Sequence, residues 1–191
     1  MESPVTTRIL ALVGSLRAGS YNKQLAEAAV KYAPDGVDVD IFDDLADVAF
    51  YNEDIDRPGA VAGADWLRVE VQSADALLLV TPEYNGSIPA SLKNAIDWIS
   101  RPHGAGVISG KPLAVIGVSH GRFGGVWAHD DARKVARIAG ASVLDDVTLS
   151  VPDGATRFAT THPAHDDEIA DAMPSILAAL AAAVRNSRTG G

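Results

Sequence analysis

The 191-residue sequence contains no cysteine. That absence excludes a disulfide framework, a thiol nucleophile and a metal site built from thiolates. Basic residues are also scarce, because 16 lysines and arginines stand against 25 acidic residues and the formal net charge is −9. A chain this acidic is poorly suited to bind nucleic acid or an anionic membrane surface. No apolar run approaches the ~20 residues that a membrane-spanning helix needs, so we expect no membrane association.

Composition and chain length predict one compact domain. Hydrophobic residues make up 47% of the sequence, enough for a single domain over residues 1–191 with an ample core. Residues 1–6 are too short and polar for a signal peptide, and we therefore expect a cytoplasmic protein. The two ends, residues 1–6 and 186–191, are expected to be disordered tails.

Apolar runs alternate with helical patterns along the chain. Strands are expected near residues 8–13, 37–42, 75–81, 112–118 and 142–149. Helices are expected near residues 21–32, 60–73, 89–99, 125–139 and 167–185. Such alternation predicts an α/β fold, in which a parallel five-stranded sheet is covered by helices on both faces. Ligand-type loops after the first, third and fourth strands are typical of the doubly wound order 2-1-3-4-5.

The loop after the first strand is typical of a phosphate site. Gly14 ends an apolar run, and hydroxyl, amide and guanidinium groups follow it before a helix that begins near Asn22. Backbone N–H groups and the positive end of the helix dipole attract a phosphate. Arg17 can add a forked contact to two phosphate oxygens. The candidate ligand-binding residues here are Ser15, Arg17, Ser20, Tyr21 and Asn22.

The spacing of two glycines narrows the kind of phosphate. Gly14 and Gly19 do not fit the dinucleotide pattern Gly-x-Gly-x-x-Gly. They have the spacing of a Walker motif, but Ser20 and Tyr21 replace its Lys-Ser/Thr pair. A nucleoside triphosphate is therefore disfavoured, and the terminal phosphate of a mononucleotide fits better. The alternative for this loop is that Ser20 serves only as a helix N-cap.

The loop after the third strand, residues 81–89, suits a flat polar ring. A tyrosine supplies a face for stacking, and backbone groups supply hydrogen bonds to the edge of a heterocycle. The candidate residues are Pro82, Glu83, Tyr84, Asn85 and Gly86. The alternative is an ordinary loop with Asn-Gly turn chemistry.

The loop after the fourth strand, residues 119–125, is rich in glycine, which permits close backbone approach or positive φ angles. Its candidate ligand-binding residues are Ser119, Gly121 and Gly124. Because parallel strands end at one edge of a sheet, the three loops should surround one ligand.

Two other kinds of site are weaker interpretations. Gly117-x-Ser119-x-Gly121 satisfies the bare hydrolase pattern, but the next helix begins only after Gly125 and no oxyanion motif precedes it. The pair His162-x-x-His165 is followed by acidic residues and looks like a helix entry. We therefore expect neither a nucleophilic serine nor a metal site.

The motifs together resemble the NADPH-dependent FMN reductase family, a flavodoxin-like group that includes chromate, quinone and azo-dye reductases. The resemblance covers residues 8 to 150 and is carried by Gly14-Ser15-Leu16-Arg17-x-x-Ser20-x-Asn22, by Pro82–Pro89 continued through Leu92–Trp98, and by Ser119-x-Gly121-x-x-Gly124-Gly125. The chain departs from the family at His120, where proline is frequent, and at Trp127, where arginine is frequent.

The resemblance implies an FMN-dependent oxidoreductase. Hydride would pass from NADPH or NADH through flavin N5 to a small acceptor such as a quinone, free flavin, azo compound or metal oxyanion, with no catalytic side chain. It also implies a homodimer or homotetramer, formed through the helices after the third and fourth strands. The residue chemistry alone indicates only a phosphorylated planar ligand. A flavodoxin-like electron carrier that does not oxidise NAD(P)H is the alternative function.

Overall fold

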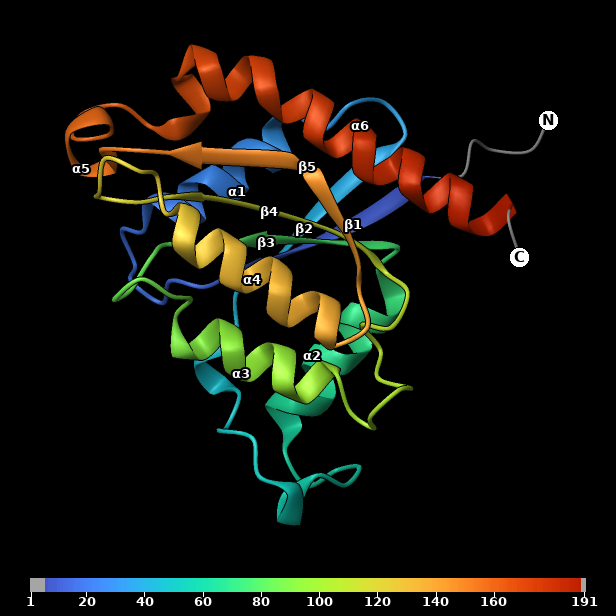
Figure 1. Ribbon diagram of the computed structural model, residues 1–191. Helices are drawn as coiled ribbons and strands as arrows, with labels where there is room; N and C mark the ends of the chain where they lie inside the picture. Colours follow the sequence, from blue (N-terminus) through green and yellow to red (C-terminus); the bar gives the residue numbers. More distant parts are fainter. Residues whose placement is uncertain (1–5, 190–191) are drawn as a thin grey trace.

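The computed structural model describes residues 6–189 (Figure 1). Its strands are β1 (Thr7–Val13), β2 (Val37–Phe42), β3 (Ala76–Val80), β4 (Pro112–Val118) and β5 (Ser142–Val151). They form one parallel sheet in the order β2-β1-β3-β4-β5, which confirms the predicted topology. The chain changes direction across the sheet between β1 and β3, and a crevice for ligands is expected at the carboxyl ends of those strands.

Helices cover both faces of the sheet (Figure 1). They are α1 (Tyr21–Lys31), α2 (Ala62–Ser73), α3 (Ala90–Ile99), α4 (Val126–Ile138), the short α5 (Gly154–Arg157) and α6 (Asp167–Thr189). Short 3₁₀ turns lie at Leu45–Asp47, Glu53–Ile55 and Pro163–His165. α1 and α6 pack on one face, and α2, α3 and α4 pack on the other. None of the helices in residues 6–189 has the length and apolar character to cross a membrane.

Alternate side chains of the central strands face the two helical layers. In β3, Leu78 belongs to the core beneath α1 and α6, whereas Leu77 and Leu79 belong to the core beneath α2, α3 and α4. All three are fully buried. A parallel strand buried on both faces is a continuous apolar run, which explains why β3 could be predicted from the sequence.

The predicted C-terminal tail is wrong for residues 186–189, because α6 continues to Thr189. Val184 is buried against the core, and Arg188 pairs with Asp75 at 2.5 Å. These contacts hold the last turn of the helix on the body of the protein. Residues 1–5, 190 and 191, to which the same prediction applied, lie outside the described residues.

Candidate functional site

The three predicted loops meet at the carboxyl edge of the sheet and line a cavity of about 380 Å³. That volume lies within the ~300–1,000 Å³ range of small-molecule sites. The predicted residues that line it are Ser15, Arg17, Ser20, Tyr21, Asn22, Pro82, Glu83, Tyr84, Ser119 and Gly121. Val118 and His120 also line it, although they were not among the predicted site residues. His120 could have been found from its place between two of those residues.

Arg17 is available to an anionic ligand. Its guanidinium lies over the Tyr21 ring, 5.4 Å from the ring centre, and is exposed. No carboxylate of residues 6–189 forms an ion pair with it. The same loop leads directly into the N-terminus of α1, whose first backbone N–H groups carry partial positive charge. This end of the cavity is therefore built to attract a negative group.

Ser20 is the N-cap of α1, as the alternative interpretation of this loop proposed. Its Oγ accepts hydrogen bonds from the N–H groups of Asn22 at 3.2 Å and Lys23 at 3.4 Å. These contacts use the oxygen lone pairs and leave the hydroxyl proton free to be donated. Capping the helix and donating to a phosphate oxygen are thus compatible roles for Ser20.

Asn22 uses one of its two amide N–H groups and its amide oxygen within the protein. Its Nδ2 donates to the Val118 carbonyl at 2.8 Å, and its Oδ1 accepts from the Val118 N–H at 2.8 Å. Both residues are buried. Because Val118 is the last residue of β4, the amide ties the start of α1 to the loop after β4. Asn22 therefore positions the two segments, and its predicted contact with a ligand remains a prediction.

The loop after β3, residues 81–89, which was predicted to hold a flat ring and is called the ring loop below, contains a type I′ turn. Tyr84 donates its N–H to the Ser87 carbonyl at 2.9 Å, and Ser87 returns a bond at 3.1 Å. Asn85 and Gly86 between them have φ angles of 54° and 77°, as a type I′ turn requires. Both are exposed and neither lines the cavity. The Asn-Gly pair therefore shapes the loop, while Pro82, Glu83 and Tyr84 face the ligand space.

The same loop is attached to α4. The Glu83 carboxylate accepts a hydrogen bond from the Ala128 N–H at 3.3 Å, where it faces the positive end of the helix dipole. Ser87 donates its hydroxyl to Asp131 at 2.7 Å. These two contacts fix the loop after β3 against the first two turns of α4, the helix that follows the loop after β4.

Gly124 allows the third loop to pack against β5 and does not line the cavity. Its φ is 65°, and a Cβ placed there would lie 2.7 Å from the carbonyl of Ser150 in β5. Only glycine lets the third loop approach β5 this closely. The residues after β5 also contact the third loop, because Gly154 donates its N–H to the Ser119 carbonyl at 2.9 Å.

A buried histidine, His129 of α4, supports the loops from beneath. Its Nδ1 lies 2.8 Å from the Ser150 Oγ, and its Nε2 lies 3.4 Å from the Thr81 carbonyl oxygen. Burial is the main cause that lowers the pKa of His129 from 6.5 to about 4, and nearby Arg133 lowers it further. The ring is therefore neutral at pH 7, with an Nε2–H that donates to Thr81 and an Nδ1 that accepts from Ser150.

No role was predicted for His129 from the sequence, so its place beside the three loops was missed. A Cβ at Gly117 would collide with His129 Nε2 and with the Thr81 carbonyl. Glycine in the middle of a buried strand marks such a close approach, so Gly117 was a usable signal. His162 was expected to lie at the entry of a helix. It caps the Pro163–His165 3₁₀ turn, and its ring contacts Glu27 at 3.0 Å.

Comparison with known proteins places the chain in a family. The family model described as NADPH-dependent FMN reductase matches residues 7–156. The chain belongs to this family. The predicted resemblance, the FMN cofactor and the oxidoreductase activity are thereby confirmed.

Similar proteins extend over nearly the whole chain. An NAD(P)H-dependent FMN reductase of Pseudomonas aeruginosa is 35% identical over 181 residues, covering 95% of this chain and 97% of its own. A 2-hydroxy-1,4-benzoquinone reductase of a Burkholderia species is 40% identical over 171 residues, covering 89% and 85%. The solved structure of a flavoenzyme NAD(P)H:(acceptor) oxidoreductase of Paracoccus denitrificans has a TM-score of 0.83 at 29% identity, covering 95% and 98%.

The cavity fits the cofactor of the family. Arg17, Ser20 and the N-terminus of α1 meet the needs of a phosphate. Pro82 and Tyr84, on a different loop, provide apolar surface, and the backbone between them can bond the edge of a ring. The residues present therefore match a phosphorylated planar molecule such as FMN.

Proposed function

We propose that this chain oxidises NAD(P)H by way of FMN bound in the three-loop cavity and reduces a small quinone. The observation that carries the proposal is one cavity lined both by Arg17, which forms no ion pair within residues 6–189, and by Pro82 and Tyr84. FMN supplies a ring nitrogen that takes up hydride and can return two electrons to an acceptor. Over one cycle NAD(P)H gives a hydride, solvent gives a proton, and a quinone becomes a hydroquinone.

The protein contributes position and electrostatics. Ser15, Arg17 and Ser20 bind the phosphate together with the N-terminus of α1. Ser119 and Gly121, on the loop after β4, border the polyol chain. The backbone of Pro82, Glu83 and Tyr84 holds the ring, whose open face is left for the nicotinamide and then for the quinone. The names of the relatives support the quinone as acceptor.

Replacement of Arg17 by alanine should weaken FMN binding about tenfold to a hundredfold. The change removes a charged hydrogen bond to the phosphate, worth about 1.5–3 kcal/mol. Riboflavin lacks the phosphate, so its affinity should change by much less. Fluorescence titration of both flavins into the apoprotein measures the two effects. Equal losses for FMN and riboflavin would show that Arg17 does not bind the phosphate.

Asn85→Pro should damage the ring loop and weaken FMN binding about tenfold. Proline holds φ near −65°, whereas the turn needs 54° at this position, and forcing the turn costs about 1–3 kcal/mol. Asn85→Gly is the matched control, because glycine adopts positive φ freely and should bind FMN like the wild type. Similar affinities for the two variants would contradict the role given to the turn.

Anaerobic mixing of the FMN-loaded protein with NADPH or NADH tests the proposed activity. The flavin absorbance near the visible maximum should bleach within one turnover and return when a quinone is added. A flavodoxin-like carrier would keep its colour under the same conditions. Absence of bleaching with both nicotinamides would overturn the proposed function.

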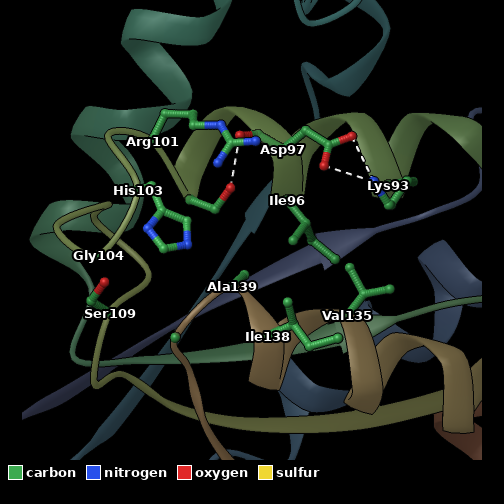
Figure 2. A pocket seen from close by; sticks show the side chains of 12 residues that line it. Lys93, Ile96, Asp97, Arg101, His103, Gly104, Ser109, Val135, Ile138 and Ala139 are labelled. Carbon is green, nitrogen blue, oxygen red and sulfur yellow. Dashed lines mark hydrogen bonds and ion pairs between the residues drawn. The ribbon is translucent and has the colours of Figure 1, made fainter.

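A second part of the proposal concerns the surface through which copies of the chain would assemble. A hollow of about 530 Å³ lies between α3 and α4, away from the three loops, with Ile96, Val135 and Ile138 on its apolar side (Figure 2). Ile138 is 75% exposed and Val135 is half-buried, and contact with another copy of the chain would remove their apolar surface from water. We expect this face to join copies of the chain as a homodimer or homotetramer. A cytoplasmic location fits the use of NAD(P)H.

Ile138→Glu should break that assembly. A carboxylate facing the apolar hollow would lose its hydration at the interface, which costs several kcal/mol. Light scattering after gel filtration should give a multiple of 19.9 kDa for the wild type and 19.9 kDa for the variant. Val30→Glu is the control, since Val30 is 46% exposed on α1, across the sheet. A monomeric wild type, or a variant of unchanged mass, would contradict the proposed interface.

A further inference from the structure

Two neighbouring aromatic side chains are exposed beside the cavity. Phe123 of the third loop and Trp127 of the first turn of α4 are 50% and 55% exposed. Their ring centres are 5.7 Å apart and the rings are tilted by 52°. They therefore form a small aromatic surface, which we call the Phe123–Trp127 wall. Neither residue is among those that line the cavity.

The contacts of α4 place the wall on the side of the cavity. Asp131, one turn after Trp127, accepts a hydrogen bond from Ser87 of the ring loop. Residues four apart lie on the same face of a helix, so Trp127 is on the face of α4 that meets this loop. Long helical side chains lean toward the helix N-terminus, which for α4 is the carboxyl edge of the sheet.

A third exposed aromatic lies on the neighbouring loop. Tyr84 lines the cavity and is 51% exposed. Its neighbour Glu83 contacts Ala128, the residue after Trp127, through a hydrogen bond of 3.3 Å. The ring loop and the first turn of α4 thus present aromatic side chains on adjoining segments at the open side of the proposed flavin site.

We propose that the Phe123–Trp127 wall is an acceptor subsite that selects planar molecules with fused aromatic rings. This inference rests on the proposed function. A fused-ring acceptor presents a larger aromatic surface than a single-ring quinone, and when bound in the cavity next to the wall it would gain more contact with the wall. Offset or edge-to-face contacts with Phe123 and Trp127 then stabilise the larger molecule. The reducing equivalents still come from NAD(P)H and one solvent proton, so the wall acts on binding and not on electron transfer.

Trp127→Ala tests the subsite through a ratio of two acceptors. The ratio of kcat/KM for 2-methyl-1,4-naphthoquinone to that for 1,4-benzoquinone should fall about tenfold, mainly through the KM of the naphthoquinone. Trp127→Phe should restore most of the ratio. Trp66→Ala is the matched control, because Trp66 is 49% exposed on α2 and is not part of the wall. An unchanged ratio in Trp127→Ala, or an equal fall in Trp66→Ala, would overturn the inference.

Equilibrium binding separates this inference from the proposed function. The oxidised FMN-loaded protein should bind the naphthoquinone about tenfold less tightly after Trp127→Ala, and this measurement needs no turnover. Failure of NAD(P)H to bleach the wild-type flavin would refute the proposed function and leave the binding comparison valid. Bleaching with equal naphthoquinone affinities in the wild type and Trp127→Ala would refute only the subsite.

Discussion

Replacement of Asn22 by leucine is expected to lower the free energy of unfolding by about 2–6 kcal/mol. The amide of Asn22 satisfies both backbone groups of Val118 through two bonds of 2.8 Å. Leucine has a similar size but cannot bond either group, and each unsatisfied buried group costs about 1–3 kcal/mol. FMN binding should weaken as well, because α1 and the loop after β4 lose their connection at the cavity. Urea unfolding of the apoprotein measures the loss of stability.

Gln24→Leu provides the comparison on the same helix. Gln24 is half-buried and makes no side-chain hydrogen bond among the described residues, so its replacement should change stability by about 0.5 kcal/mol or less. A loss below about 1 kcal/mol for Asn22→Leu would show that the bridge to Val118 contributes little to the folded state.

The second large effect concerns pH and His129. The pKa of this histidine is lowered from 6.5 to about 4 in the folded protein, first of all by burial, while Arg133 lowers it further and Thr81 and Asp130 oppose the shift. As pH falls, the unfolded chain therefore takes up a proton before the folded one does. The stabilising contribution of neutral His129 is complete above about pH 6.5 and is lost as pH falls toward 4. The loss amounts to about 3 kcal/mol.

Unfolding experiments between pH 7 and 4 on the wild type and His129→Gln isolate this contribution. The stability difference between the two proteins should shrink by about 3 kcal/mol over that range, because glutamine does not titrate. Carboxylates that titrate in both proteins cancel in the difference. His103→Gln is the control at an exposed position. Parallel curves for the wild type and His129→Gln would contradict the buried neutral state.

The sequence predicted most of the fold because its signals are local. The apolar run Ala76–Val80 is a strand buried on both faces, and Ser20 before a helical pattern is an N-cap. The alternation of strands and helices then indicated the α/β class, and the ligand-type loops after three of the strands indicated the strand order. For the same reason the three ligand loops could be placed at one edge of the sheet.

The parts that could not be predicted depend on pairs far apart in the sequence. Asn22 and Val118 are 96 positions apart, and no local pattern indicates that the amide of one bonds the backbone of the other. The Asn85–Gly86 pair predicted a turn, but its place outside the cavity depends on how Ser87 contacts α4. The place of His129 in α4 likewise depends on the space that Gly117 leaves in β4, and the two residues are on different elements.

A crystal structure of the FMN complex tests the central claim most directly. We expect the phosphate within hydrogen-bonding distance of Arg17 and the N-terminus of α1, and the flavin ring against Pro82, Glu83 and Tyr84. A phosphate bound away from Arg17, or a flavin ring in the hollow between α3 and α4, would contradict the account.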